Sequence, residues 1–142
     1  MKNFQKYYNW LLIDSIIVIL VGVYVTYFNS TQSFIFNRCI NPAFWPDGMI
    51  SNNETIRFIR FIYCLFGAVM IIWGILLWFI LRNGFNAKQK WAWQSIFVSI
   101  IIWFPVDESF SIYYGVTFNA LFNLFFLFTF LLPLLLSRKH FH

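Results

Sequence analysis

Four long apolar runs are the feature that most constrains how this chain can fold. They occupy about residues 8–28, 55–81, 91–113 and 116–136. A helix of about 20 apolar residues crosses the hydrocarbon core of a bilayer, and it satisfies its own backbone hydrogen bonds in lipid. The sequence therefore predicts an all-α fold: a single polytopic membrane domain over residues 1–142, built as a bundle of four transmembrane helices.

The charged residues agree with this interpretation and predict an orientation. Only 11% of the residues are charged, against about 25% in soluble proteins. Because Lys and Arg gather at the ends of the apolar runs, we do not expect nucleic acid as a partner despite the net charge of +5. The positive-inside rule predicts a multi-pass protein of the inner (cytoplasmic) membrane with both termini in the cytoplasm. The cations on the side of the termini are Lys2, Lys6, Arg82, Lys88, Lys90, Arg138 and Lys139.

The first apolar run contains an acid, Asp14. The run is too long for a signal peptide and no cleavage site of small residues follows it, so we expect an uncleaved first helix. Two interpretations of Asp14 stay open. It is either a carboxylate that binds a proton or a cation, or an acid tied to a neighbouring Lys, Arg or hydroxyl group near the interface.

The long loop between the first two helices contains the turn former Pro46-Asp47-Gly48. Pro fixes its own φ, and Gly accepts a positive φ after Asp. Aromatic side chains such as Trp45 prefer the membrane interface. We therefore expect a folded external cap that includes Trp45, Asp47 and Gly48.

The second helix carries a seam of residues at heptad spacing. In lipid, helices associate by close packing, and small residues on a shared face let the backbones approach. We expect the seam to face the bundle and to turn its two arginines inward at the external end, although long Arg side chains can also snorkel to the headgroups. The seam consists of Arg57, Arg60, Cys64, Gly67, Ile71, Gly74 and Trp78.

Two adjacent acids, Asp107 and Glu108, lie within the third apolar run. An ionisable group in a span faces the bundle interior or a wet cavity and finds a partner. A rise of about 1.5 Å per residue puts both acids near the external end of the third helix, level with two asparagines of the fourth. Consecutive helical residues point about 100° apart, so we expect one acid to pair with an arginine of the seam, Arg60 first. The expected polar cluster is Arg57, Arg60, Asp107, Glu108, Asn119 and Asn123.

No stretch of the sequence matches a known catalytic, metal or cofactor site. The two cysteines have no CxxC spacing, which speaks against thiol relay chemistry. Both histidines lie in the C-terminal tail, which removes intramembrane bis-His haem and most intramembrane zinc sites. Hydrolase, metalloprotease and phosphate-loop motifs do not occur. We therefore predict no catalytic residue, no metal and no cofactor.

Four motifs of the sequence together resemble those of a known group of membrane proteins. They are Trp45-Asp47-Gly48 (W-x-D-G), Trp91 and Trp93 (W-x-W), Asp107 to Gly115 (D-x-x-x-S-x-Y-x-G) and Phe118 to Asn123 (F-N-A-x-F-N). They resemble a group of small bacterial four-span inner-membrane proteins of uncharacterised activity, over about residues 41–138. The resemblance implies that the external polar cluster is a feature of the group, and it implies no activity.

Three classes of function fit these observations. The first is a structural or binding module in contact with membrane lipids, which holds an apolar or amphipathic ligand or a partner membrane protein at its external end. The second is a small proton-coupled transporter that uses Asp14. The third is a membrane enzyme that acts on an apolar substrate through Asp107 or Glu108. The transporter would be similar to the four-helix multidrug exporters, which also have four spans and an acid in the first helix. We favour the first class, because the sequence lacks a catalytic motif and its long first loop departs from those compact exporters.

Phosphatase fusions test the predicted orientation. A phosphatase that needs the oxidising periplasm should be inactive when fused after His142 and active when inserted beside Asn52. Activity of the C-terminal fusion, or a mature chain that begins near residue 29, would contradict the prediction.

Overall fold

The structure is a computed structural model of the chain and describes residues 2–29, 35–45 and 52–141. Within these residues it contains helices and no strands. Four helices are long and apolar enough to cross a membrane, which confirms the predicted all-α four-span architecture. By the length and composition of these helices the chain is a multi-pass membrane protein. They are α1 (Lys2–Tyr27), α2 (Asn53–Ile80), α3 (Lys90–Tyr113) and α4 (Thr117–Ser137).

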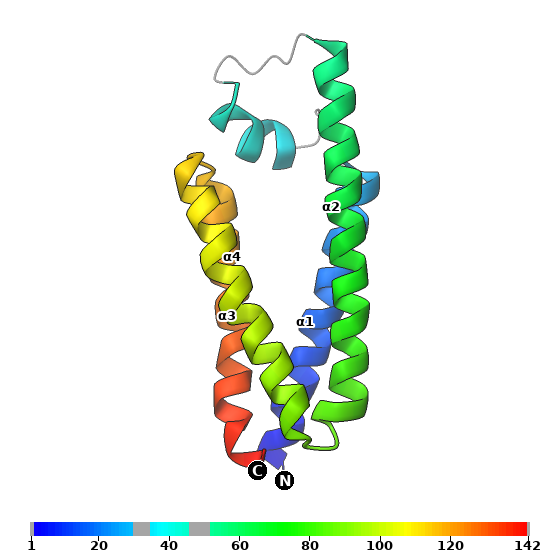
Figure 1. The fold of residues 1–142 in the computed structure, drawn as a ribbon, viewed down its shortest axis with the longest axis vertical. Helices are drawn as coiled ribbons and strands as arrows, with labels where there is room; N and C mark the ends of the chain where they lie inside the picture. Colours follow the sequence, from blue (N-terminus) through cyan, green and yellow to red (C-terminus); the bar gives the residue numbers. More distant parts are fainter. Residues whose placement is uncertain (1, 30–34, 46–51, 142) are drawn as a thin grey trace.

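Shorter helical segments extend or connect the long ones. In the described part of the long loop, η1 (Phe36–Ile40) and η2 (Asn41–Ala43) follow each other. The π-helical turn η3 (Leu81–Phe85) prolongs α2, and η4 (Arg138–His140) follows α4. Together α2 and η3 make a span of 33 residues, which at 1.5 Å per residue is about 50 Å and exceeds the roughly 30 Å hydrocarbon core. One end of α2 therefore projects beyond the rest of the bundle (Figure 1).

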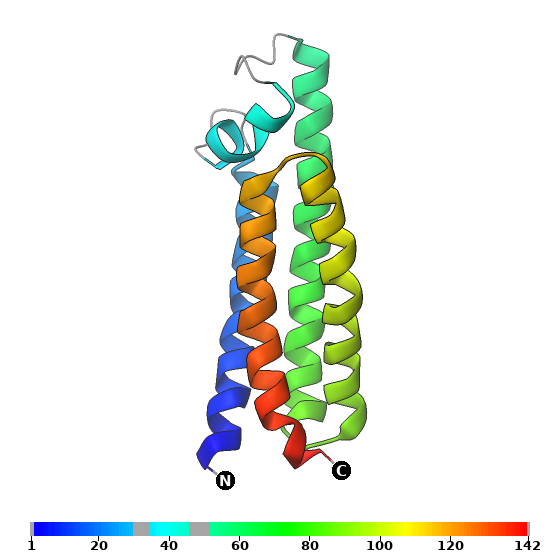
Figure 2. The same cartoon turned by 90° about the vertical axis from the view of Figure 1, so that its left-hand side faces the viewer.

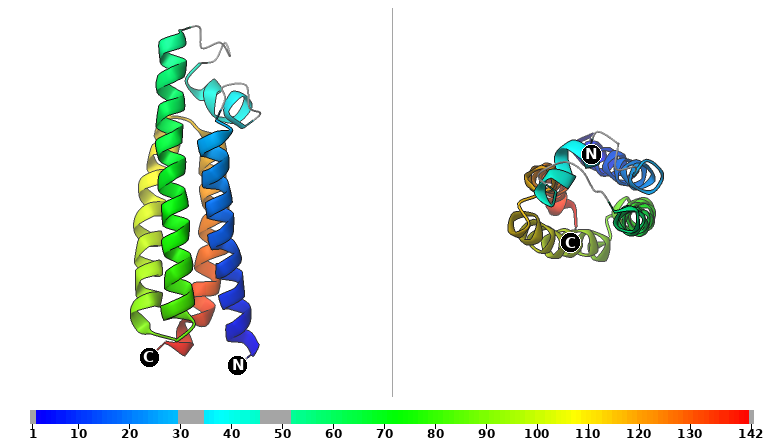
Figure 3. Two further views of the ribbon diagram at one scale, coloured as in Figure 1. Left: turned by 90° about the vertical axis from the view of Figure 1, so that its right-hand side faces the viewer. Right: turned by 90° about the horizontal axis from the view of Figure 1, so that it is seen from above.

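The four long helices form two hairpins, α1 with α2 and α3 with α4 (Figure 1). Both chain termini lie at one end of the bundle, and η1 and η2 lie at the other (Figures 1 and 2). The hairpins converge at the first end and diverge toward the second (Figure 1). We call these the termini end and the cap end. Seen from above, η1 and η2 lie over the side of the bundle formed by α1 and α4 (Figure 3).

The buried apolar core fills the half of the bundle nearer the termini. Trp73 of α2 and Trp103 of α3, with ring centroids 6.2 Å apart, pack against this core as partly buried residues. Toward the cap end the two hairpins share no further large apolar cluster among the described residues. The core consists of Phe4, Tyr8, Leu11, Val18, Leu77, Leu81, Phe85, Ala92, Ile96, Ile100, Phe126, Phe130, Leu134 and Phe141.

Glycines let the backbones of α1 and α2 touch. A Cβ atom added to Gly67 would lie 2.6 Å from the carbonyl oxygen of Gly22, and one added to Gly74 would lie 2.6 Å from Cγ1 of Ile19. No real Cβ fits at such distances, so only Gly permits this approach. The predicted seam of α2 is thus confirmed at Gly67 and Gly74, and its partner is α1.

Filling this contact tests the seam. Gly67→Leu should lower the free energy of unfolding by about 1–3 kcal/mol or more, because overpacking a tight interface forces the backbones apart. Thermal unfolding in detergent measures the loss. Val69→Leu is the matched control, since Val69 is on the same helix and 63% exposed. Equal melting temperatures for the two variants would show that α1 and α2 do not pack in this way.

Candidate functional site

The acid Asp107 is held first by residues of its own helix. Trp103 Nε1 donates to Asp107 Oδ2 at 3.1 Å, and Ser111 Oγ donates to the Asp107 backbone oxygen at 2.8 Å. The three residues are spaced at i, i+4 and i+8, so they share one face of α3. This face carries a polar stripe inside an apolar span.

Two amides of α4 complete the site. Asn119 Nδ2 donates to Asp107 Oδ1 at 3.0 Å and lies 2.8 Å from Ser111 Oγ. Asn123 Nδ2 lies 3.4 Å from the same hydroxyl. Asn123 and Ser111 are buried, so the hydroxyl joins α3 and α4 away from solvent. We call Trp103, Asp107, Ser111, Asn119 and Asn123 the Asp107 cluster.

The turn between α3 and α4 sets the register of this cluster. Gly115 has a φ of +69°, a left-handed conformation that Gly adopts at little cost. The Val116 amide donates to the Ser111 carbonyl oxygen at 2.9 Å, which closes the end of α3 as glycine-terminated helices commonly do. Because the turn is short, the last turns of α3 meet the first turns of α4. The acid and both asparagines therefore lie at the cap end, as the sequence predicted.

Neutral donors satisfy the Asp107 carboxylate. Each of its oxygens accepts one of the hydrogen bonds described above, from an indole and from an amide. Asp107 is half-buried, and these hydrogen bonds replace the hydration that its carboxyl group loses. The arrangement is well suited to holding α3 against α4.

The structure does not bring the predicted arginines to the acids, so the expected pairing is wrong. Arg57 and Arg60 are exposed on α2, and within the described residues neither forms an ion pair with Asp107 or Glu108. Two features keep them apart. Arg57 and Arg60 lie near the start of α2, at the end that projects beyond the rest of the bundle, and α2 belongs to the other hairpin, which diverges from α3 at the cap end (Figure 1). Arg side chains in this position can extend to the lipid headgroups.

Glu108 stands apart from the cluster, as expected for the next residue on a helix. It is half-buried, and its Oε2 atom is buried without a hydrogen-bond partner within the described residues. Only one of the adjacent acids is therefore satisfied by the bundle.

Asp14 of α1 is a second incompletely satisfied acid. It is 5% exposed, and its Oδ2 atom has no hydrogen-bond partner among the described residues. The neighbouring hydroxyl of Ser15 donates to the Leu12 carbonyl oxygen instead, at 2.7 Å. The interpretation of Asp14 as an acid tied to a neighbouring group thus finds no support at this oxygen.

The described part of the predicted cap is folded. Phe36 of η1 is buried, with its ring centroid 4.3 Å from that of Tyr63 on α2. Phe44 contacts Tyr114 at the end of α3, with centroids 5.8 Å apart. The cap therefore touches both hairpins. Trp45 is half-buried, whereas Asp47 and Gly48 lie outside the described residues.

A second polar contact at the cap end joins α1 to α2. Asn29 Nδ2 donates to the Thr26 carbonyl oxygen at 2.9 Å and lies 3.2 Å from Cys64 Sγ. The Cys64 thiol donates to the same Thr26 oxygen at 3.4 Å. Cys64, predicted on the seam, is confirmed there.

Sequence reasoning missed three contributors to these contacts, and each had a recognisable signal. Trp103 and Ser111 lie four residues on either side of Asp107, the spacing at which helical side chains meet. Asn29 follows directly after the first helix, where a side-chain amide can bond to free carbonyl groups.

Within the described residues, no group of three His, Cys, Asp or Glu side chains could hold a metal ion.

The chain was compared with known proteins by sequence and by fold. No family model, curated protein or solved structure matches it.

A double-mutant cycle tests the Asp107 cluster. Asn119→Leu and Asp107→Leu should couple with about 0.6–1.7 kcal/mol, the range of hydrogen bonds between membrane helices, because each removes one end of the same bond. Reversible unfolding in mixed detergent measures the coupling. The control cycle, Arg60→Met with Asp107→Leu, should be additive within about 0.5 kcal/mol. Coupling to Arg60 but not to Asn119 would overturn the assignment.

Proposed function

We propose that the protein is a binding module of the cytoplasmic membrane, which holds an apolar or amphipathic ligand, or a partner membrane protein, at its cap end. One observation carries this proposal. Among the residues that the structure describes, the buried core joins the two hairpins only in the half nearer the termini, and toward the cap end the hairpins diverge (Figure 1). A ligand or partner would supply the packing that this half lacks.

The Asp107 cluster offers polar groups to such a ligand. Within the described residues, both asparagines use their Nδ2 atoms for the cluster. Each amide also has a carbonyl oxygen that accepts hydrogen bonds, so Asn119, which is half-buried, can receive a hydroxyl or amine. One polar anchor in an apolar setting is the usual composition of a small-molecule site. This favours an amphipathic ligand.

The cap supports the same assignment, because it spans the end where the hairpins diverge. Its contacts at Phe36 and Phe44 reach α2 and α3 in turn, and η1 and η2 lie across the end of the bundle (Figures 2 and 3). A ligand between the hairpins would be shielded on the water side and would enter from the bilayer.

The proposed orientation rests on the cations at the termini end. Arg82 lies 4.9 Å from the Trp78 ring centroid and Arg138 lies 5.8 Å from that of Trp93. Cations beside aromatic rings are typical of a membrane interface, and an excess of cations is typical of its cytoplasmic side. We therefore propose cytoplasmic termini in an inner membrane, in keeping with the resemblance to small bacterial four-span proteins.

Proton-coupled transport through Asp14 is a second candidate. It is favoured by the buried Oδ2 atom of that residue, which has no hydrogen-bond partner in the described part of the chain. Catalysis through Asp107 has less support, because hydrogen bonds within the bundle already engage both of its carboxylate oxygens.

Site-specific photo-crosslinking tests binding at the cap end. Photoreactive p-benzoylphenylalanine replaces Phe122, which is half-buried beside the core, or Phe125 one turn away, which is 62% exposed. In native membranes, position 122 should give a discrete adduct, and mass spectrometry then distinguishes a small ligand from a protein. Position 125 should give only mixed lipid adducts. The same adducts at both positions would count against a site between the hairpins.

A further inference from the structure

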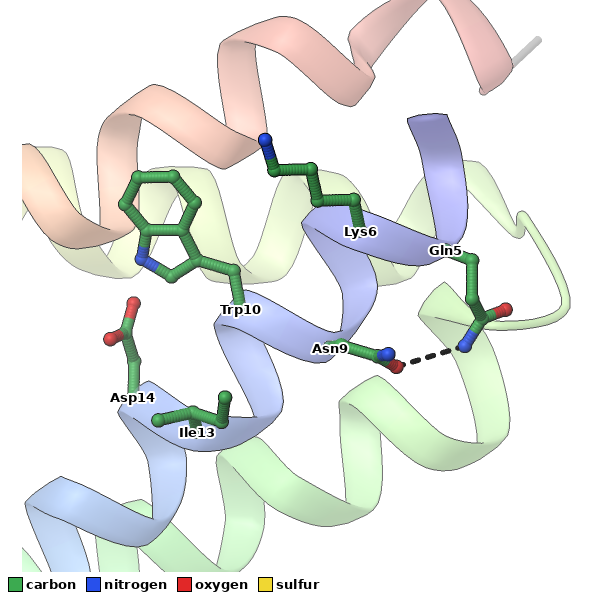
Figure 4. Close-up of a pocket in the computed structure, with 6 residues that line it drawn as sticks. All are labelled: Gln5, Lys6, Asn9, Trp10, Ile13 and Asp14. Atoms are coloured by element: carbon green, nitrogen blue, oxygen red, sulfur yellow. Dashed lines mark hydrogen bonds between the residues drawn. The ribbon is translucent and has the colours of Figure 1, made fainter. Parts of the chain in front are cut away.

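An open groove runs along α1 near the termini end (Figure 4). It has a volume of about 750 Å³ and is open along one side. Two rows of side chains on α1 line it: Gln5, Asn9 and Ile13 in one row, and Lys6, Trp10 and Asp14 in the other.

The polar groups of the two rows differ in what they can still bind. In the first row, Gln5 Nε2 donates to Asn9 Oδ1 at 2.9 Å, so these amides partly satisfy each other. In the second row, Asp14 lines the groove, although 95% of its surface is covered, and its Oδ2 atom has no partner within the described residues. Figure 4 shows this carboxylate beside the Trp10 indole, on the side of α1 that faces α4.

The depth of Asp14 restricts what can pair with it. Asp14 follows Lys6 by eight residues, which places it about 12 Å farther along the helix axis. Lys6 is exposed near the start of α1, at the level expected for headgroups. A phospholipid amine held at that level does not reach Asp14, whereas a cation that dissolves in the hydrocarbon region does.

We propose that this groove binds a lipophilic organic cation, with its charge paired to the Asp14 carboxylate and its apolar body against Trp10 and Ile13. A carboxylate inside a span is costly without a partner, and a cation supplies one. The neighbouring indole adds a cation–π attraction, which is strongest for Trp. Lys6 at the groove mouth carries the same charge as the ligand and weakens its binding, while Asp14 excludes an anion from the deeper part. This site is separate from the proposed cap-end site.

Two probes of equal shape and opposite charge test the proposal on the purified full chain in detergent. We expect tetraphenylphosphonium to bind at least about tenfold more tightly than tetraphenylborate, a difference that calorimetry resolves. Asp14→Asn should abolish this preference, and Asp14→Glu should retain it. Glu108→Gln is the matched control, because it removes another carboxylate with a buried, unpartnered oxygen at the far end of the bundle; it should leave binding unchanged.

Further variants separate the parts of the site. Trp10→Leu should weaken tetraphenylphosphonium binding, and Lys6→Gln should strengthen it by removing a like charge. The proposal is overturned if the wild type binds both probes equally, binds neither, or prefers tetraphenylborate. A preference for tetraphenylborate would instead assign the groove to an anionic lipid at Lys6. Unchanged affinity in folded Asp14→Asn would also overturn it. These outcomes do not depend on Phe122 crosslinking, so either proposal can fail alone.

Discussion

The direct backbone contact between α1 and α2 is the constraint on which the rest of the structure depends. In lipid, apolar side chains gain little by leaving one apolar setting for another, so helices associate where their shapes allow close approach. Gly22 and Gly67 allow it here, since each would place a Cβ within 2.8 Å of the other's carbonyl oxygen. The contact makes one stiff hairpin of the first two helices. The second hairpin packs against it mainly through the aromatic and aliphatic core near the termini.

Three acids within the spans show two answers to the cost of a carboxylate in a membrane. Asp107 is satisfied by neutral donors that the bundle itself supplies. Glu108, one residue later, retains a buried oxygen without a partner among the described residues, and so does Asp14, about midway along α1. Charge neutralisation by arginine, the obvious solution in a chain with a net charge of +5, is used for none of these three within the described residues. For Asp107, hydrogen bonds from indole and amide groups replace part of the lost hydration, and the packing of α3 against α4 holds these donors in place.

The two proposed sites differ in what they would recognise. At the cap end the hairpins lack a shared apolar core, and a polar cluster lies in the wall, which suits an amphipathic ligand or a partner helix. On α1 an apolar groove leads to a single carboxylate, which suits a cation.

The sequence by itself determined the features that depend on one helix at a time. The four spans follow from the length of the apolar runs. The seam at Gly67 and Gly74 follows from heptad spacing, and the level of Asp107 with Asn119 follows from rise per residue and a short turn. Only the tertiary structure decided which helix faces which. Counting residues gave Arg60 and Asp107 a similar depth, but α2 continues through η3 and its start, near Arg60, projects beyond the bundle. A count also cannot measure the sideways distance between α2 and α3. That distance depends on how the α1–α2 contact and the core near the termini tilt the two hairpins apart. Because the arginines are out of reach, the partner of Asp107 is Asn119 on the neighbouring helix.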